Sequence, residues 1–360
     1  MLSTVTSEVK NEKVFSISSS KRLLNIGFVP MTDCAPLIAA KELGFFKRAG
    51  LEVNLSREAG WATVRERMLH RELDGSHAHA SMIYEMSCGL GQPSVPCLTG
   101  LMLSHNGSAI SFSNELWDLG VRDARSMKRV IEQHRGKRKF RFAVVMKFST
   151  QNYLMRKWLR RGGIDPDRDV ELVVVPPPQV FTCMMRGHID GYCAGEPWSS
   201  IGLTEGVCWC AALSEEVSRM HPEKVLLVRQ RFAESRHEEH IAMIVALIEA
   251  AEYCDKPVNR NELAGILSQP KYFNVSKKAL LNALQGPFQR GMGGQSSALD
   301  AIVFRRNNAS PPTEAKARWV LSEINLNKLT PTSLDLSTEA IKSYFRMDLY
   351  EEAERLVSAA

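Results

Sequence analysis

The sequence has no apolar run long enough to cross a membrane. The longest runs, such as residues 241–251, are far shorter than a bilayer span and are interrupted by Glu249. Residues 1–22 mix acidic and basic side chains with serine and contain no apolar segment of secretory length. We therefore expect residues 1–22 to form a flexible leader, and we expect the protein to be cytoplasmic without a membrane contact.

The sequence also lacks the cysteine spacings that characterise redox and zinc motifs. Cys208 and Cys210 are separated by one residue rather than two. Scattered cysteines in apolar surroundings are typical of buried free thiols in a reducing compartment. The pattern predicts free thiols for all eight cysteines: Cys34, Cys88, Cys97, Cys183, Cys193, Cys208, Cys210 and Cys254.

Motifs for catalysis, metal binding and nucleic-acid binding are missing as well. No nucleophile–base pair or pair of carboxylates indicates an enzyme, so we expect no catalytic residue and no cofactor. His77 and His79 alternate as strand ligands could, but without partnering ligands a short strand below a cleft is favoured over a metal site. The basic loop 136–141 has no interleaved aromatic residues, and the net charge of +6 is modest, so direct nucleic-acid binding is not expected.

What is present is a regular alternation of strands and helices. Short apolar runs alternate with segments of helical periodicity, which is typical of a parallel, doubly wound α/β sheet. The predicted strands are residues 23–30, 51–58, 75–80, 97–104, 108–113, 140–146, 170–176, 190–196 and 224–230. The predicted helices are residues 34–50, 61–73, 81–90, 124–137, 150–163, 177–189, 238–255, 260–269, 277–286 and 314–324.

The alternation restarts after residue 107, which predicts two lobes. Residues 23–107 would form the first part of lobe 1 and residues 108–223 lobe 2. Residues 224–360 would supply the return crossover, the helical completion of lobe 1 and a C-terminal extension. Two doubly wound sheets joined by two crossover strands enclose a hinged cleft, and ligands of such sheets bind at the carboxyl ends of the strands. The architecture predicts a clamp for a small molecule.

Several segments together resemble a known family. "IGFVPMTDCAPLIAAKELGFFKRAGLEV", "EAGWATVRERM", "LRRGGIDPDRDVELVVVPPPQV", "DGYCAGEPW" and "HPEK" are similar to the nitrate/bicarbonate-binding branch of ABC-type solute-binding proteins. The resemblance runs from about residue 24 past residue 266. It implies an α/β, bilobed, periplasmic-binding-protein-like fold and a cleft that binds a small oxyanion.

The resemblance also implies individual ligand-binding residues. Trp61 would present its indole to a planar anion, and Lys224 would neutralise the charge. The residues alone favour other interpretations, with Trp61 as a core residue at a helix N-terminus and Lys224 as a solvated lysine ahead of a strand. In this family a lysine at the position of Lys224 goes with nitrate and a carboxylate with bicarbonate, because nitrate has no proton to donate. The lysine therefore favours nitrate or nitrite.

Four further positions complete the implied site. Gly195 would allow a close approach of the ligand, and Glu196 would follow at a helix start. Gln151 stands where the transport proteins have a histidine, and Ser108 where they have a glutamine. Both replacements remain hydrogen-bond donors, so a site for nitrate survives chemically, with an expected effect on affinity or on the choice between nitrate and nitrite.

A nitrate clamp inside the cell would serve sensing, as in the cytosolic NasS-type nitrate sensors that these segments resemble. That resemblance implies a protein partner, the RNA-binding transcription antiterminator NasT, which is released when nitrate or nitrite binds. One alternative is the substrate-binding component of a nitrate/bicarbonate ABC transporter. Another is an enzyme of the thiamin-pyrimidine-synthase type on the same fold, which would need a cofactor-binding lysine and cleft histidines.

Overall fold

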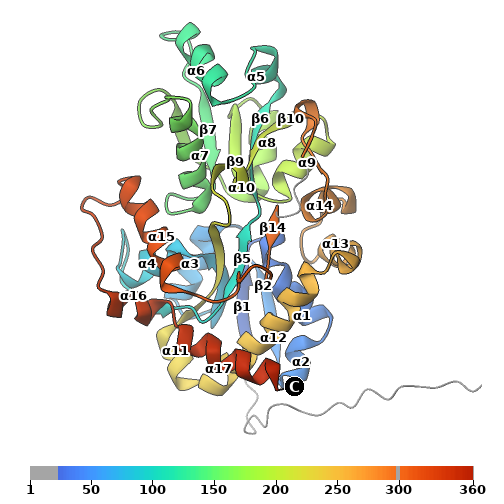
Figure 1. Ribbon diagram of the computed structural model, residues 1–360, viewed down its shortest axis with the longest axis vertical. Helices are drawn as coiled ribbons and strands as arrows, with labels where there is room; N and C mark the ends of the chain where they lie inside the picture. The colour runs from blue at the N-terminus through green and yellow to red at the C-terminus, as the bar shows by residue number, and fades with distance from the viewer. Residues whose placement is uncertain (1–22, 297–300, 360) are drawn as a thin grey trace, which may run out of the picture.

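The computed structural model describes residues 23–296 and 301–359, which form two α/β lobes stacked one above the other (Figure 1). The bilobed fold predicted from the sequence is confirmed. The predicted leader, residues 1–22, lies outside the described residues. None of the helices in the described ranges is long and apolar enough to cross a membrane.

Lobe 1 is built on a seven-stranded sheet with the order β14-β5-β11-β3-β1-β2, and β4 pairs with β11. β1 is parallel to β2 and β3, whereas β11 is antiparallel to β3, β4 and β5. The sheet is therefore mixed, because β11 re-enters it from the other lobe. Its strands are β1 (Leu24–Phe28), β2 (Val53–Arg57), β3 (Gly75–His79), β4 (Cys97–Leu98), β5 (Met102–Asn106), β11 (Pro222–Arg229) and β14 (Ile302–Val303).

Lobe 2 is built on a five-stranded sheet with the order β10-β6-β9-β7-β8. β7 runs parallel to β8 and β9, while β6 is antiparallel to both of its neighbours. Its strands are β6 (Ser108–Ser113), β7 (Arg141–Val144), β8 (Glu171–Val174), β9 (Gly191–Gly195) and β10 (Cys208–Leu213); β12 (Phe288–Gln289) and β13 (Gln295–Ser296) form a separate pair.

Helices cover both sheets, and several differ from the predicted ranges. Gly44 has a φ of 77°, a left-handed conformation that suits glycine, and it divides the predicted helix 34–50 into two. The helices are α1 (Ala35–Glu42), α2 (Phe45–Arg48), α3 (Trp61–Leu69), α4 (Ser81–Ser87), α5 (Asn114–Asp118), α6 (Ala124–Gln133), α7 (Thr150–Arg161), α8 (Val180–Met185), α9 (Trp198–Thr204), α10 (Ser214–Val217), α11 (Gln230–Ser235), α12 (His237–Asp255), α13 (Arg260–Leu267), α14 (Lys277–Leu284), α15 (Glu314–Leu326), α16 (Thr338–Tyr344) and α17 (Met347–Ser358). Single 3-10 turns are η1 (Thr32–Cys34), η2 (Pro177–Gln179), η3 (Pro257–Asn259) and η4 (Gly291–Gly293).

The predicted strand 97–104 is two strands, because the chain bends at Gly100. A Cβ at Gly100 would lie 2.7 Å from a methyl carbon of Ile244 on α12, so glycine permits the helix to pack closely there. The C-terminal helices α16 and α17 follow α15; α17 packs on α12 at the base of lobe 1. Sequence periodicity did not indicate these two helices.

Two strand segments carry the chain between the lobes, and residues 288–294 also pack against β10 of lobe 2. β5 leads through Gly107 into β6, and the return runs from α10 into β11. One apolar cluster includes Met31 and Trp61 of lobe 1 together with Tyr153 and Trp198 of lobe 2. The lobes therefore share a core beside the crossovers, and this core holds the cleft walls in position.

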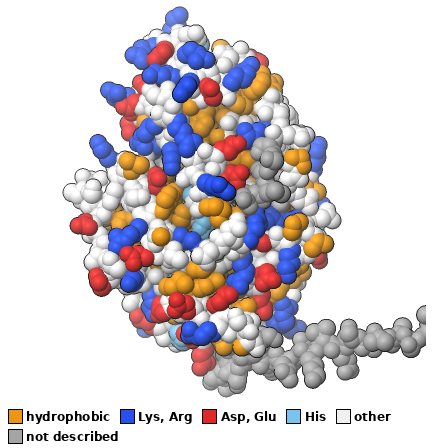
Figure 2. Space-filling model, in the orientation of Figure 1, with side chains coloured by type: hydrophobic (Ala, Val, Ile, Leu, Met, Phe, Trp, Pro, Cys, Tyr) orange, Lys and Arg blue, Asp and Glu red, His pale blue; other side chains and the backbone are white. Residues whose placement is uncertain are grey.

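Lysine and arginine side chains gather on the upper lobe in the face drawn in Figure 2, where α6 and α7 lie. Arg125 and Arg129 of α6 and Arg160 and Arg161 of α7 are exposed. This face of lobe 2 is thus basic and solvated, in contrast to the interior of the cleft.

Candidate functional site

The floor of the cleft is formed by segments at the carboxyl ends of two neighbouring parallel strands. Asp33 lies in η1, just after β1, and His77 and His79 lie on β3. All three side chains are fully buried. His77 Nε2 lies 2.7 Å from Asp33 Oδ1, and with an ionised Asp33 the neutral imidazole donates this hydrogen bond.

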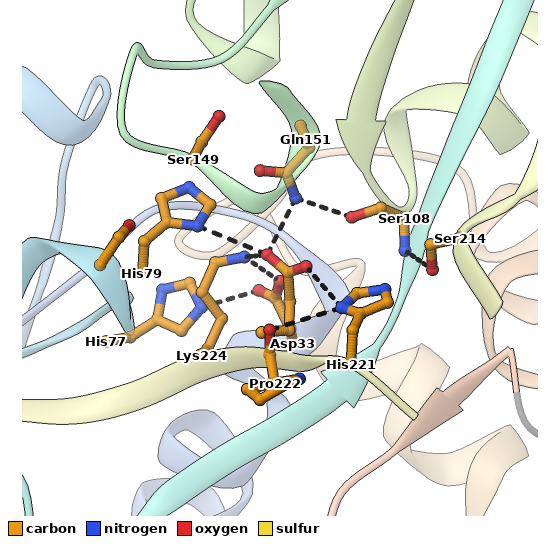
Figure 3. Close-up of polar contacts among 12 residues, drawn as sticks. Asp33, His77, His79, Ser108, Ser149, Gln151, Ser214, His221, Pro222 and Lys224 are labelled. Carbon is orange, nitrogen blue, oxygen red and sulfur yellow. Dashed lines mark hydrogen bonds and ion pairs between the residues drawn. The ribbon is translucent and has the colours of Figure 1, made fainter. Parts of the chain in front are cut away.

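Two consecutive residues of β11 complete this floor. The pairing of β11 with β5 is irregular between Pro222 and Lys224, and such a bulge turns neighbouring side chains toward one side. Lys224 Nζ donates to Asp33 Oδ2 at 2.7 Å and to Glu223 Oε1 at 2.6 Å (Figure 3). His79, opposite Lys224 in the sheet, has its Nδ1 3.4 Å from Glu223 Oε1. The ammonium is thus held between two carboxylates.

Lobe 2 faces this cluster with neutral hydrogen-bonding groups. Ser149 caps α7 by accepting from the backbone N–H of Asn152, so Gln151 projects from the first turn of the helix. Gln151 Nε2 donates to Ser108 Oγ at 2.7 Å and to Glu223 Oε1 at 2.9 Å, as Figure 3 shows. The backbone N–H of Ser108 donates to Ser214 Oγ at 3.2 Å. Gln151 therefore links the two lobes inside the cleft.

Trp61 and Gly195 lie at the edge of the cluster. Lys224 Nζ is 5.4 Å from the centroid of the Trp61 ring, and the His79 ring centroid is 4.4 Å from it. Within the described chain, Trp61 Nε1 is buried without a hydrogen-bond partner. A Cβ at Gly195 would lie 2.7 Å from Met31 Sδ and 3.6 Å from Asp33 Oδ2, so glycine leaves room beside the carboxylate.

Glu196 has a different role from that of the other predicted residues. Its Oε2 accepts a hydrogen bond from the backbone N–H of Ser200 in the first turn of α9, at 3.0 Å. Its backbone carbonyl accepts from the N–H of Thr32 at 2.6 Å, across the lobes. Burial raises the pKa of Glu196 to about 7. Glu196 therefore caps a helix and ties the lobes together beside the cluster.

The ion pairs determine the charges in the cluster. Burial alone raises the pKa of Asp33 and of Glu223, but Lys224 and the neighbouring histidines lower both below their usual values. Burial lowers the pKa of Lys224, and the two carboxylates raise it above its usual value. Burial, and then the charge of Lys224, lowers the pKa of His79 to about 4. At neutral pH the cluster holds one positive and two negative charges.

A larger hollow adjoins the cluster on the side of Trp61. It has a volume of about 820 Å³ and lies between α3 of lobe 1 and the β7–α7 segment of lobe 2. Trp61, Arg65, Lys147, Phe148 and Leu329 are among its lining residues. This hollow is the mouth of the cleft, and the polar cluster is its closed interior.

The structure brings five of the six predicted site residues together: Trp61, Ser108, Gln151, Gly195 and Lys224. Sequence reasoning missed Asp33, Glu223, His77 and His79 as members of the cluster. The histidines carried a usable signal, because alternate residues of one strand face the same side and this strand ends at the cleft. Glu223 carried none, since strand alternation places it on the face opposite to Lys224.

Comparison with known proteins identifies the family. Residues 18–268 match the model of the NMT1-like family, which is more than half of the chain. The nitrate/nitrite binding protein NrtA of Synechococcus elongatus is 32% identical over 346 residues, covering 93% of this chain and 78% of that protein. The bicarbonate-binding protein CmpA of a Synechococcus species is 31% identical over 353 residues, with coverages of 93% and 78%.

A solved structure agrees with these sequence matches. The periplasmic nitrate-binding protein NrtA from Synechocystis superposes with a TM-score of 0.88 at 27% identity, covering 94% of this chain and 90% of that one. The chain spans less than half the length, 44 to 45%, of the nitrate and bicarbonate transport ATP-binding proteins that it also matches. The chain belongs to the NMT1-like family, within the group that contains NrtA and CmpA.

Proposed function

We propose, from this family membership and from the cleft, that the protein binds nitrate or nitrite between its lobes. The observation that carries the proposal is the buried ammonium of Lys224 beside neutral donors from the other lobe. Nitrate has three acceptor oxygens and one delocalised charge, so one cation and several N–H or O–H donors satisfy it. Ser108 Oγ and the unpartnered Trp61 Nε1 are such donors. Gln151 Nε2 donates to Ser108 and Glu223 and would exchange one of these acceptors for the ligand.

Bicarbonate is the second candidate ligand. Gln151 Oε1 and Glu223 Oε2 are buried and have no hydrogen-bond partner among the described residues. These oxygens only accept hydrogen bonds, and bicarbonate has an O–H group to donate whereas nitrate has none. NrtA and CmpA resemble the chain equally well, so overall identity does not separate the two ligands. The lysine supports nitrate, and these acceptors support bicarbonate.

Calorimetric titration with nitrate, nitrite, bicarbonate and chloride tests the ligand. A four-atom ligand at about −1.5 kcal/mol per heavy atom gives roughly −6 kcal/mol, so a dissociation constant in the tens of micromolar is expected. Lys224→Met should remove the binding. Lys137→Met, in an exposed loop of lobe 2, is the matched control and should leave it unchanged. Saturable binding of bicarbonate alone would reject nitrate and nitrite as the ligands.

The biological role that we propose is a cytosolic sensor of the NasS type. It would hold an antiterminator of the NasT type and release it when nitrate or nitrite binds. Two features support this role. All eight cysteines are free, as expected for a reducing compartment, and Gln151 couples the cleft contents to the position of lobe 2. By linkage, a partner that is released by nitrate must itself weaken nitrate binding.

The sensor role has its own test. Association of the purified protein with a NasT-type antiterminator should fall as nitrate is added, and nitrate should bind more weakly when the partner is in excess. An association that is indifferent to nitrate would reject the sensor and favour a transport-linked binding protein. The matched relatives are named as binding or import proteins, which is consistent with a protein that is not an enzyme.

A further inference from the structure

The cleft cluster has one more negative than positive charge before any ligand enters. Lys224 is its single cation, and both of the hydrogen bonds that its ammonium donates, at 2.7 and 2.6 Å, go to carboxylates. Asp33, Glu223 and Lys224 are all fully buried, so solvent does not screen their charges. A monovalent anion bound beside them would leave two uncompensated negative charges. Such an excess is strongly unfavourable in a desolvated site.

A proton taken up by the cluster would remove this excess. Titratable and charged groups approach Glu223 from each element around it. They are Asp33 from η1, His77 and His79 from β3, His105 from β5, Tyr153 from α7, Cys193 from β9, and His221 and Lys224 at the start of β11. Lys157 and Lys316 act from farther away on His221 and His105. The ordinary proton acceptors of this set are the histidines.

His79 is the histidine best placed to take the proton. Its Nδ1 faces Glu223 Oε1 at 3.4 Å, and among the described residues neither of its ring nitrogens has a hydrogen-bond partner, whereas His77 and His221 each have one nitrogen bonded. The Trp61 ring lies 4.4 Å from the imidazole, where its face would stabilise a cation. His77 is already bonded to Asp33, and His221 stacks on Trp319 and faces Glu223 only at 3.6 Å.

We propose that the cleft binds its oxyanion together with one proton, which His79 holds between Glu223 and the ligand. The inference rests on the proposed function and specifies the ligand of that same site as an anion plus a proton. Protonated His79 donates from Nδ1 to Glu223 and has a second N–H, at Nε2, to donate to an oxyanion. The negative charge of Glu223 is therefore the reason that a proton is taken up with the anion, and His79 is the group that binds this proton.

This arrangement makes binding dependent on pH with a defined sign. Burial and the charge of Lys224 hold the pKa of His79 at about 4 in the cluster, so the free protein carries this imidazole neutral at pH 7. A bound anion raises the pKa. Above pH 4 and below the raised pKa, affinity must then fall as pH rises, by up to tenfold per pH unit for one proton.

Calorimetry of nitrate binding in two buffers of equal pH but different ionisation enthalpy counts the protons directly. We expect close to one proton taken up per nitrate at pH 6, and an affinity that falls about tenfold from pH 6 to pH 7. Nitrate binding with no proton uptake and no dependence on pH would overturn this inference and leave the proposed function standing. No binding of nitrate or nitrite between pH 5.5 and 8 would overturn both.

Two variants assign the proton to residues. His79→Gln should abolish proton uptake and weaken nitrate binding at pH 6 at least tenfold. Glu223→Gln removes one negative charge and keeps an acceptor, so it should reduce uptake and bind nitrate at pH 8 more tightly than the unaltered protein does. His188→Gln, at an exposed histidine of lobe 2, is the control and should change neither quantity. Full proton uptake in folded His79→Gln would overturn the assignment, with circular dichroism used to confirm folding.

Discussion

The two lobes contribute opposite kinds of chemistry to the cleft. Lobe 1 supplies every charged group of the cluster, through Asp33, Glu223 and Lys224, and also its histidines. Lobe 2 supplies only neutral groups, namely Gln151, Ser108 and Ser214. The charges are bonded to one another within lobe 1, so their arrangement does not need lobe 2. Closure adds hydrogen bonds to a preformed electrostatic site.

Bonds outside the cluster also hold the lobes together. Trp198 Nε1 donates to the carbonyl of Pro30 at 2.9 Å, and Arg160 donates to Asn327 Oδ1 at 2.8 Å. Asn282 of α14 donates to Ser200 of α9 at 3.0 Å. Closure therefore depends on contacts around the cleft as well as within it. The comparison predicts that lobe 1 variants alter charge and stability, whereas lobe 2 variants alter affinity in smaller steps.

The largest effect is expected from removing the single cation of lobe 1. Lys224→Met leaves Asp33 and Glu223 buried beside each other without a counter-charge. Breaking a buried ion pair in this way costs about 3–5 kcal/mol, so the free energy of unfolding should fall by that order. Nitrate binding should become undetectable. Denaturant unfolding and calorimetry measure the two losses.

A double variant separates the two losses. Adding Glu223→Gln to Lys224→Met leaves one carboxylate, which retains its hydrogen bond from His77. It should recover much of the stability but none of the nitrate binding. If Lys224→Met were as stable as the unaltered protein, the cluster would not be electrostatically coupled as its distances indicate.

The second effect is a loss of stability in acid. Burial lowers the pKa of His79 to about 4 and that of His240, in the lobe 1 core, to about 3. The unfolded chain titrates near pH 6.5, so below that pH it binds protons that the folded protein does not, and stability falls as pH falls. Between pH 7 and pH 5, each of these two histidines lowers the free energy of unfolding by about 2 kcal/mol.

Nitrate distinguishes these two histidines. Saturating nitrate should restore the part of the unfolding free energy that is lost in acid through His79, because a bound anion stabilises the protonated form of this histidine. Nitrate should not change the loss of stability that is caused by His240, because this histidine packs against Phe232 away from the cleft. Thermal unfolding between pH 5 and pH 7, with and without nitrate, measures the difference. An equal effect of nitrate at both pH values would contradict it.

Much of the fold was predictable because hydrophobic alternation and helical periodicity are local properties. The restart at Ser108 and the order of strands and helices from β6 to β9 follow from such local patterns, apart from the short α5. The patterns did not predict α9, β10 or α10 of lobe 2. Boundaries failed where tertiary packing decides them, as at Gly100 under α12. The resemblance placed Trp61, Gln151 and Lys224 in one cleft, which spacing along the chain alone does not do.

The cluster itself could not be predicted completely for a physical reason. Glu223 reaches the ammonium only because β11 is bulged against β5, and a bulge has no reliable signature in a single sequence. Asp33 becomes the partner of Lys224 across 191 residues of chain. The sequence therefore predicts Lys224 and Glu196 as the charged residues of the site. In the folded cluster, Lys224 is instead paired with Asp33 and Glu223, and the cluster carries an excess negative charge.

The third effect tests the link between the lobes. Gln151→Ala removes the donor that reaches both Ser108 and Glu223, while Lys224 still satisfies Glu223. We expect nitrate affinity to fall about tenfold, which is roughly 1.4 kcal/mol, with little change in stability. Gln151→His restores a donor and should recover part of the affinity. If Gln151→Ala lowered nitrate affinity a hundredfold, lobe 2 would contribute more to the binding free energy than its neutral hydrogen bonds explain.

The smallest effect is expected at Ser108, where lobe 2 begins. Its hydroxyl accepts from Gln151, and its backbone N–H donates to Ser214, so Ser108→Ala loses one orienting contact and keeps the strand. A neutral hydrogen bond contributes about 1 kcal/mol, so nitrate affinity should fall by roughly threefold to fivefold. Ser111→Ala, three residues farther along β6 and on the other face of the sheet, is the matched control and should bind as the unaltered protein does. Equal losses of nitrate affinity in both variants would mean that Ser108 acts through the strand rather than through its hydrogen bond with Gln151. Gln151 would then be the one side chain that supports the contrast between a charged lobe and a hydrogen-bonding lobe.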